Sequence, residues 1–175
     1  ARFTGVRVRS IANLGAYYSI FAMYIPTFTG AGLLSGVYTI PAIHVEVKGV
    51  FTHTVSTDAY RGAGRPEAVY VIERLVDAAA RQLQINPIDL RRRNFIPKDA
   101  MPYTTAIRKV YDNNDDQEVK FPPIVYDTGD FSRMMETALK QANYDGFKSR
   151  RDKSRRAGKL RGLGIAMLIE NAGGY

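Results

Sequence analysis

The sequence predicts an α+β fold, a mixed β-sheet with helices packed against it. Short runs in the N-terminal third alternate apolar and polar residues, as half-buried strands do. Two stretches, after Pro66 and after Asp130, instead place apolar residues at three- and four-residue steps, the pattern of amphipathic helices. Of the 175 residues, 45% are hydrophobic, which is enough apolar material for a packed core.

The first fifty residues predict strands separated by turns. Residues 6–11 and 43–51 alternate in polarity, and 37–40 are also rich in residues that favour strands. The asparagine and glycine within 13–16 tolerate positive φ, so we expect a turn there. Residues 19–32 are apolar enough to be buried, but their pattern leaves strand and helix both open.

Helices are expected further along the chain. Pro66 suits the first turn of a helix, because its missing N–H needs no partner there. Asn86, followed by proline, predicts a second, short helix that ends at about Asn94. Asp130 predicts the N-cap of a third helix, and the basic stretch after it is expected to stay helical to Arg156. The apolar faces expected for the first and third helices are Val69, Ile72, Leu75, Val76, Ala79, Ala80 and Leu83, and Phe131, Met134, Met135, Ala138, Leu139 and Ala142.

Two segments are harder to assign. Residues 96–128 contain four prolines and no clear period, which indicates a crossover segment or linker. Residues 162–170 have the composition of a buried strand. Because a strand without neighbours invites pairing with another chain, we expect the chain to self-associate.

The net charge of +8 lies almost entirely in one segment. Residues 148–161 hold eight basic residues and one acid, which is +7 of the total, whereas the rest of the chain holds 17 basic and 16 acidic groups. The segment supports a runner-up function, a non-enzymatic module that binds nucleic acid or another anionic surface. Phe147 is its only aromatic neighbour, and basic runs are more often solvated helix faces or contacts to a partner subunit, so nucleic acid is not the favoured partner.

Several familiar sites are excluded. Zero cysteines rule out disulfides, thiolate catalysis, zinc fingers and any iron–sulfur cluster held by this chain. No run reaches the ~18 consecutive apolar residues of a membrane span. The acidic run 112–116 lacks the glycine and the glutamate of a calcium loop, and the glycines of 62–67 lack the third member of a dinucleotide fingerprint. His44 and His53 have no ligand spacing, so no metal-binding residue is expected.

The loop 58–68 has the features of an anion site. Two glycines one residue apart, Gly62 and Gly64, let a ligand approach the backbone closely. The loop leads into a helix N-terminus, and Arg61 and Arg65 flank the glycines with forked donors. The alternative is a tight strand-to-helix turn, with Arg65 in a salt bridge or on the surface; for Arg65 we prefer this alternative.

The run AYRGAGRPEA at 59–68 resembles the glycine–arginine loop of molybdenum hydroxylase large subunits, the xanthine dehydrogenase and aldehyde oxidase family that includes aerobic carbon monoxide dehydrogenase. The resemblance covers nearly the whole chain, in matching order and spacing. Its other pieces are NLGAY at 13–17, VFTHT at 50–54, LRRRNFI at 90–96, YDTGDF at 126–131 and GLGI at 162–165.

This resemblance implies a molybdopterin-type molybdenum cofactor that hydroxylates a small carbonyl, N-heterocyclic or related substrate with water as oxygen source. FAD and iron–sulfur clusters on other domains or subunits would carry the electrons away. Arg61 would be the catalytic residue, and Tyr60, Gly62, Ala63 and Gly64 would line the cofactor. Residues 1–96 would belong to a first molybdopterin-binding domain, 97–128 to a linker and 129–175 to the start of a second, in a cytoplasmic enzyme.

Departures from the family pattern limit these implications. The carbon monoxide enzymes carry a copper-binding cysteine at the position of Gly62, and the xanthine-oxidising relatives carry a phenylalanine at the position of Ala63. Neither copper-dependent nor purine chemistry is therefore supported. No residue matches the family's general base, a glutamate, and we expect an internal fragment of a longer subunit that is inactive by itself.

Overall fold

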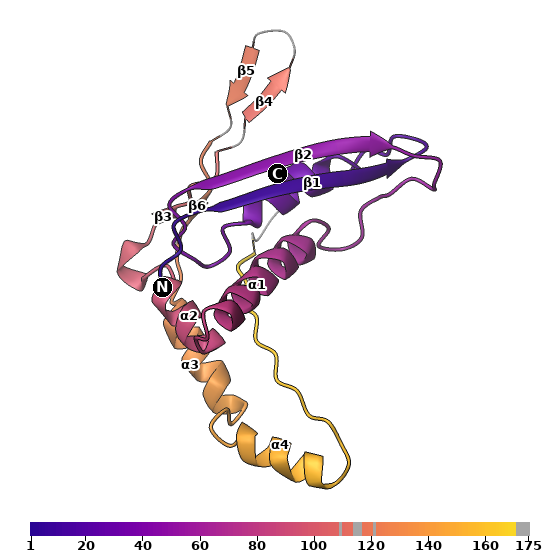
Figure 1. The fold of residues 1–175 in the computed structure, drawn as a ribbon. Coiled ribbons are helices and arrows are strands. Elements are labelled where there is room, and N and C mark those ends of the chain that lie inside the picture. The colour runs from indigo at the N-terminus through magenta and orange to yellow at the C-terminus, as the bar shows by residue number, and fades with distance from the viewer. Residues whose placement is uncertain (109, 114–116, 121, 171–175) are drawn as a thin grey trace.

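The computed structural model describes residues 1–108, 110–113, 117–120 and 122–170. It confirms an α+β fold, in which a parallel pair of strands, β1 (Val6–Gly15) and β2 (Ile43–Phe51), lies over the helix α1 (Arg65–Gln82) (Figure 1). The register runs from Val6 opposite Ile43 to Asn13 opposite Val50. A parallel pair needs a crossover connection. Here it contains a π-helical turn, η1 (Ile25–Gly30), and a 3₁₀ turn, η2 (Ala31–Leu33).

The alternation predicted for the two strands is confirmed. Val8 of β1 and Val45 of β2 pack with Leu33, Leu34 and Ala68 into a small core between the sheet and α1. The charged residues of both strands lie on the opposite, exposed face, where Arg9 and Glu46 form a salt bridge of 3.2 Å. At the middle of β1 the alternation is reversed in polarity, since Ser10 faces inward and Ile11 is exposed. The N-terminus of α1 is thereby fixed against the inner face of the sheet.

Two predictions for this region are wrong. The expected turn at 13–16 is mostly strand, since β1 extends to Gly15; Asn13 uses its side chain to accept from Gly15 N at 2.9 Å at an irregularity of the ladder. Residues 37–40 form no strand. Tyr38 forms an isolated bridge with Phe95 instead, so this segment is paired with the end of a helix.

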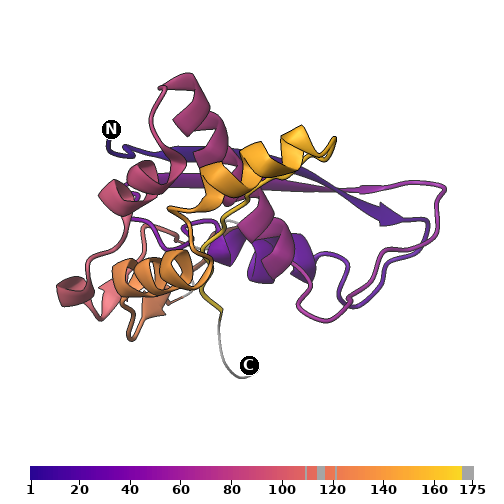
Figure 2. The ribbon, with the colours of Figure 1, turned by 90° about the horizontal axis from the view of Figure 1, so that it is seen from below.

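The three expected helices are confirmed, and the basic stretch is helical to Arg156 as expected, although as a helix separate from the third. The α2 helix (Pro87–Asn94) is capped by Asn86, which accepts from Ile88 N at 2.8 Å. The α3 helix (Phe131–Gln141) is capped by Asp130, which accepts from Arg133 N at 3.0 Å. The basic helix α4 (Phe147–Arg156) follows, and Figure 2 shows α3 and α4 from below.

The predicted apolar faces are correct except at five positions, which are exposed: Leu75, Leu83, Met134, Ala138 and Ala142. Leu75 of α1 and Met134 of α3 are 48% and 46% exposed. Both lie at the border of their helical stripe, where no described segment covers them. The main core takes its buried members from the segment after η2, from α1, from α2 and the two residues after it, from residue 126, from α3 and from residue 167. The largest of these side chains are Tyr38, Ile40, Leu90, Phe95, Ile96, Tyr126, Phe131 and Met135.

Residues 96–128 have more structure than their composition indicated. After a 3₁₀ turn, η3 (Lys98–Ala100), the strand β3 (Tyr103–Thr104) pairs antiparallel with β6 (Val125–Tyr126). Between them, β4 (Val110–Asn113) pairs with β5 (Gln117–Lys120), and this hairpin projects from the molecule (Figure 1). The pairs are too short for periodicity to reveal them. The acidic run 112–116 lies partly outside the described residues.

The predicted strand at 162–170 is wrong. This segment is extended without strand pairing, and Ile165, Met167 and Ile169 turn toward the core while the residues between them are exposed. The composition identified the alternation of a strand, but among the described residues no second strand lies beside it. Within the described part of the chain, no helix is long and apolar enough to cross a membrane.

Candidate functional site

The two glycines of the loop before α1 have left-handed backbones, with φ of +83° at Gly62 and +88° at Gly64. A Cβ on Gly64 would overlap Thr29 Oγ1 and come within 2.5 Å of the carbonyl oxygen of Ile25. A Cβ on Gly62 would meet nothing closer than the Pro66 ring at 3.8 Å. Gly64 is therefore fitted tightly against η1, whereas Gly62 presents open backbone on its other side.

Hydrogen bonds hold this loop in place. Thr29 Oγ1 donates to the carbonyl of Ala63 at 2.7 Å, and Gly64 N donates to Glu67 Oε2 at 2.8 Å. Glu67 thus caps the N-terminus of α1. Sequence reasoning missed this role, although a glutamate three residues after a cap position is its usual signal.

Tyr60 and Arg61 project from the rigid loop. Tyr60 is 88% exposed, and Arg61 is exposed as well. Among the described residues, no acid lies within salt-bridge distance of the Arg61 guanidinium. Its donors are free to meet a ligand.

An open cavity of about 1090 Å³ lies beside the loop. Arg61, Gly62 and Arg65 line one side of this cavity, and residues 164–166 and 168–170 line the other. Arg65 Nη1 and Glu170 Oε1 are 2.7 Å apart and join the two sides. The salt-bridge interpretation of Arg65 is confirmed. Of the predicted site residues, Arg61 and Gly62 line this cavity, whereas Tyr60 and Ala63 are not part of its lining and Gly64 is buried against η1.

A second, smaller cavity of about 310 Å³ lies on the other side of the loop, beneath the sheet. Its lining is mainly apolar and includes Val8, Val45 and Leu34, and Gly64 and Glu67 contribute to it from the loop side. The short stretch from Arg61 to Glu67 therefore separates an open, charged cavity from a small apolar one.

A buried ion network supports the wall of the larger cavity. Arg91 of α2 is fully buried and donates to Glu73 Oε2 through Nε at 3.0 Å and Nη2 at 2.8 Å, while Nη1 is 3.0 Å from Asp77 Oδ1. Tyr38 donates to Glu73 Oε1 at 2.5 Å. Arg91 Nη2 also donates to the carbonyl of Ile165 at 3.2 Å, which fastens the segment 164–170 over α1.

This environment perturbs two titrating groups. Burial, reinforced by the neighbouring Glu73 carboxylate, raises the pKa of the Tyr38 hydroxyl well above its ordinary range, so Tyr38 stays a donor. For Arg91, burial acts to lower the pKa, but attraction to Glu73 and Asp77 outweighs it and the pKa is raised. Arg91 therefore stays charged within this network. Sequence reasoning missed it, because its members are far apart in the chain.

The described side chains do not form a metal-binding site by themselves. Within the described ranges, no three histidine or acidic side chains converge in a way that could hold one. The loop and its cavity instead offer backbone, guanidinium groups and a phenol, which suit an organic, anionic ligand.

Comparisons with known proteins identify the family. The family model described as molybdopterin cofactor-binding domain matches residues 1–95. The nicotine 6-hydroxylase large subunit of Paenarthrobacter nicotinovorans is 30% identical over 174 residues, covering 98% of this chain and 19% of the relative. The carbon monoxide dehydrogenase large chain of Hydrogenophaga pseudoflava is 34% identical over 181 residues, covering 98% and 20%.

A solved structure of a related enzyme has a similar fold over most of this chain. Quinoline 2-oxidoreductase from Pseudomonas putida 86 superimposes with a TM-score of 0.74 and 27% identity, over 90% of this chain and 18% of that one. The chain thus spans about a fifth of the length of these relatives. The loop at 60–64 lies within the matched domain. The chain belongs to the molybdopterin cofactor-binding family of molybdenum hydroxylase large subunits.

Proposed function

We propose that this chain is part of the molybdopterin-binding catalytic subunit of a molybdenum hydroxylase that oxidises a small carbonyl, N-heterocyclic or related substrate with water as the oxygen source. One observation carries the proposal: within the matched domain, the rigid loop presents open backbone at Gly62 and a free guanidinium at Arg61 to a large cavity. A bound molybdenum cofactor would supply the redox chemistry.

The residues of the loop fit such a group. A methyl group placed on Gly62 would have no neighbour closer than 3.8 Å, so a cofactor could approach this backbone closely. Gly64 holds the loop against η1, Ala63 lies between the two glycines, and Tyr60 offers a hydroxyl and a ring face. These four residues are the proposed cofactor-binding residues: Tyr60, Gly62 and Ala63 as contacts, and Gly64 through the loop conformation that it holds.

Arg61 is the proposed catalytic residue. Its side chain is exposed at the rim of the cavity, and its planar fork donates two parallel hydrogen bonds to an oxyanion. Donors that are already in place when charge develops on oxygen are commonly the largest single contribution to catalysis. Because α1, Glu67 and Thr29 fix the loop, Arg61 needs little rearrangement of the backbone to act in this way.

The relatives narrow the substrate class. Their names include nicotine and quinoline, which are N-heterocycles, as well as carbon monoxide. This chain has no cysteine, so it lacks the thiolate that the carbon monoxide enzymes carry in this loop. We therefore propose an N-heterocyclic or carbonyl substrate rather than carbon monoxide.

The proposal includes partners and organisation beyond this chain. Relatives are named as large subunits or as one subunit of a complex, which supports iron–sulfur and flavin partners that carry electrons away. The proposed division is a first molybdopterin-binding domain at 1–96, a linker at 97–128 and the start of a second domain from 129. A cytoplasmic location is part of the same proposal.

The test uses the full-length enzyme with its partner subunits. We expect near-stoichiometric molybdenum by metal analysis and substrate-dependent reduction of an artificial electron acceptor under anaerobic conditions. Product formed in ¹⁸O-labelled water should contain the label. Purified enzyme without molybdenum, or product oxygen derived from O₂, would overturn the proposal.

A further inference from the structure

The α4 helix carries charge that its own surroundings do not balance. Its 10 residues hold six basic side chains and one acid, and none of its residues is buried. Among the described residues, none of these cations forms a salt bridge. Lys148 with Arg151, and Arg151 with Arg155, are like-charge neighbours one turn apart, which destabilises a helix.

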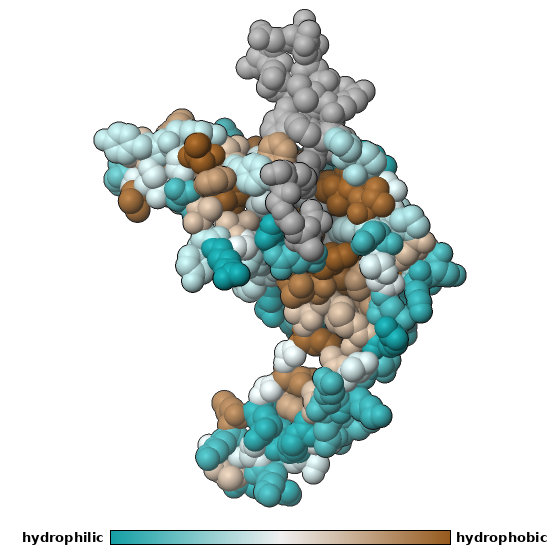
Figure 3. Space-filling view, turned by 180° about the vertical axis from the view of Figure 1, so that it is seen from behind, coloured by the Kyte–Doolittle hydropathy of each residue, from teal (hydrophilic) through white to brown (hydrophobic). Residues whose placement is uncertain are grey.

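Such a helix is marginal by itself. Helices shorter than ~12–15 residues gain most of their stability from an apolar face packed on a core. The α4 helix has no such face, and Figure 3 shows the hydrophilic surface that covers it. A neighbour that supplies negative charge would relieve the repulsion among its cations.

The direction of α4 is nevertheless fixed. Arg150 Nη1 donates to the carbonyl of Asn143 at 2.8 Å, and Nη2 donates to that of Ala142 at 2.9 Å. These are carbonyls at the C-terminal end of α3, which a helix leaves without partners. The Arg150 guanidinium also lies 5.9 Å from the centre of the Phe147 ring. The remaining cations are thus displayed on a preset surface rather than on a loose tail.

A cleft of about 730 Å³ lies between α4 and the helices α1 and α2. Its charged lining comprises Arg74, Arg81, Lys148 and Arg151, against Asp77 and Asp145. Asp77 is already paired with Arg91 at 3.0 Å and with Arg74 at 3.7 Å. The free charge of the lining is therefore positive. Its apolar lining is Pro87, Ile88, Phe147, Leu163 and Ile165.

We propose that this cleft is the docking site for an acidic segment of a partner subunit, one that carries an apolar side chain among its carboxylates. The carboxylates would pair with Arg81, Lys148 and Arg151, and the apolar side chain would lie on Leu163 and Ile165. The inference rests on the proposed function only for the identity of the partner.

A protein segment fits this cleft better than a nucleic acid does. Base stacking requires exposed aromatic faces beside the cations. Phe147 has the Arg150 and Arg151 guanidinium groups over its ring at 5.9 and 5.8 Å, and the Tyr144 hydroxyl accepts from Asn86 at 3.3 Å. The aromatic side chains of the cleft are thus already engaged, while Leu163 of its aliphatic lining is 46% exposed.

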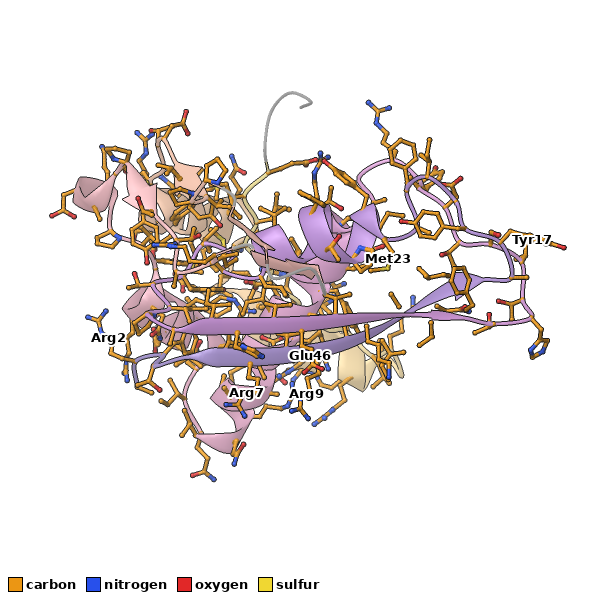
Figure 4. All side chains as sticks on the ribbon, turned by 90° about the horizontal axis from the view of Figure 1, so that it is seen from above. Arg2, Arg7, Arg9, Tyr17, Met23 and Glu46 are labelled. Carbon is orange, nitrogen blue, oxygen red and sulfur yellow. The ribbon has the colours of Figure 1, made fainter. Side chains whose placement is uncertain are left out.

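The test compares two charge reversals in the full-length large subunit. The cleft variant is Lys148→Glu with Arg151→Glu. The control is Arg7→Glu with Lys48→Glu, the same change of charge on the exposed face of the sheet, where Arg7 lies beside Arg9 (Figure 4). Binding to the purified iron–sulfur and flavin subunits is measured by isothermal titration calorimetry at low and moderate salt.

We expect the cleft variant to weaken binding at least about tenfold at low salt and to reduce the salt dependence, while the control changes both by less than about threefold. The neutral pair Lys148→Gln with Arg151→Gln should weaken binding by a smaller factor with an unchanged melting temperature. This pair separates lost docking from misfolding.

Equal binding by wild type and the cleft variant, or equal loss in the control, would overturn the inference. So would a DNA mobility shift at low salt that disappears in the cleft variant without any change in subunit binding. An enzyme that hydroxylates normally but assembles independently of the cleft refutes this inference alone. A cleft-dependent complex without molybdenum refutes the proposed function alone.

Discussion

Gly64→Ala should mainly reduce the stability of the protein and Gly62→Ala should mainly impair its function, although the two positions have nearly the same φ. At Gly64, φ is +88°, and the new methyl group would collide with Thr29 Oγ1 and with the Ile25 carbonyl, which is 2.5 Å away. The Ile25 contact is with backbone, so no rotamer change relieves it. At Gly62, φ is +83°, but the methyl group meets nothing within 3.8 Å.

The magnitudes follow from these contacts. Each substitution places a non-glycine residue in a sparsely populated backbone region, at a cost of about 1–3 kcal/mol. Gly64→Ala adds overpacking against a fixed carbonyl, which typically costs a further ~1–3 kcal/mol. We therefore expect Gly64→Ala to lose about 2–6 kcal/mol of stability, and Gly62→Ala to lose only the backbone share.

The loss of enzymatic function should be larger for Gly62→Ala than its loss of stability. The methyl group at Gly62 enters the space that we assign to the cofactor, so Gly62→Ala should lose molybdenum or turnover although it folds. The assays are thermal unfolding of the full-length subunit, hydrogen exchange at the first turn of α1, and turnover per bound molybdenum. Equal destabilisation by both substitutions would refute the steric argument, and full activity of Gly62→Ala would refute the assignment of the open face.

Other residues give further predictions. Arg61→Ala in the full-length enzyme should raise the transition-state barrier by ~2.7–4 kcal/mol with little change in melting temperature, and Arg61→Lys should recover only part of the loss; unchanged turnover per molybdenum would remove Arg61 from the site. Arg91→Met should cost about 3–5 kcal/mol in chemical unfolding, because it leaves the Glu73 carboxylate buried without its partner; a loss below about 1 kcal/mol would contradict the network. The backbone N–H of Arg133, with Lys98 nearby, lowers the pKa of Asp130, so the cap stabilises the protein above the ordinary pKa of 3.8 and this stability is lost as the pH falls through the lowered pKa of the folded state. Asp130→Ala should therefore reduce the loss of stability at low pH in unfolding experiments. The same loss of stability in wild type and variant would contradict this role of Asp130. Residues 1–175 purified by themselves should bind no molybdenum, since a site needs its supporting residues; stoichiometric metal would refute this.

The features that the sequence predicted correctly are local ones. Asn86 and Asp130 cap helices through hydrogen bonds within three residues, so the chain around them carries the whole signal. The loop before α1 was likewise recognisable, because its two glycines and the helix start adjoin. Strand periodicity also located β1 and β2, since each buries one face.

The features that the sequence did not predict depend on distant partners. The parallel pairing of β1 with β2 joins residues 37 positions apart, such as Val6 and Ile43, and nothing in either strand specifies its direction. The periodicity of 162–170 is real, but a strand also requires a neighbour. The Arg91 network joins α2 to α1 and to Ile165, and the run LRRRN does not reveal which of its three arginines is buried.

The loop from Arg61 to Glu67 lies between two cavities, an open, charged one of about 1090 Å³ and a mainly apolar one of about 310 Å³. The same short backbone therefore forms part of the lining of both cavities. Its hydrogen bonds to Thr29 and Glu67 are contacts on which the shape of each cavity depends.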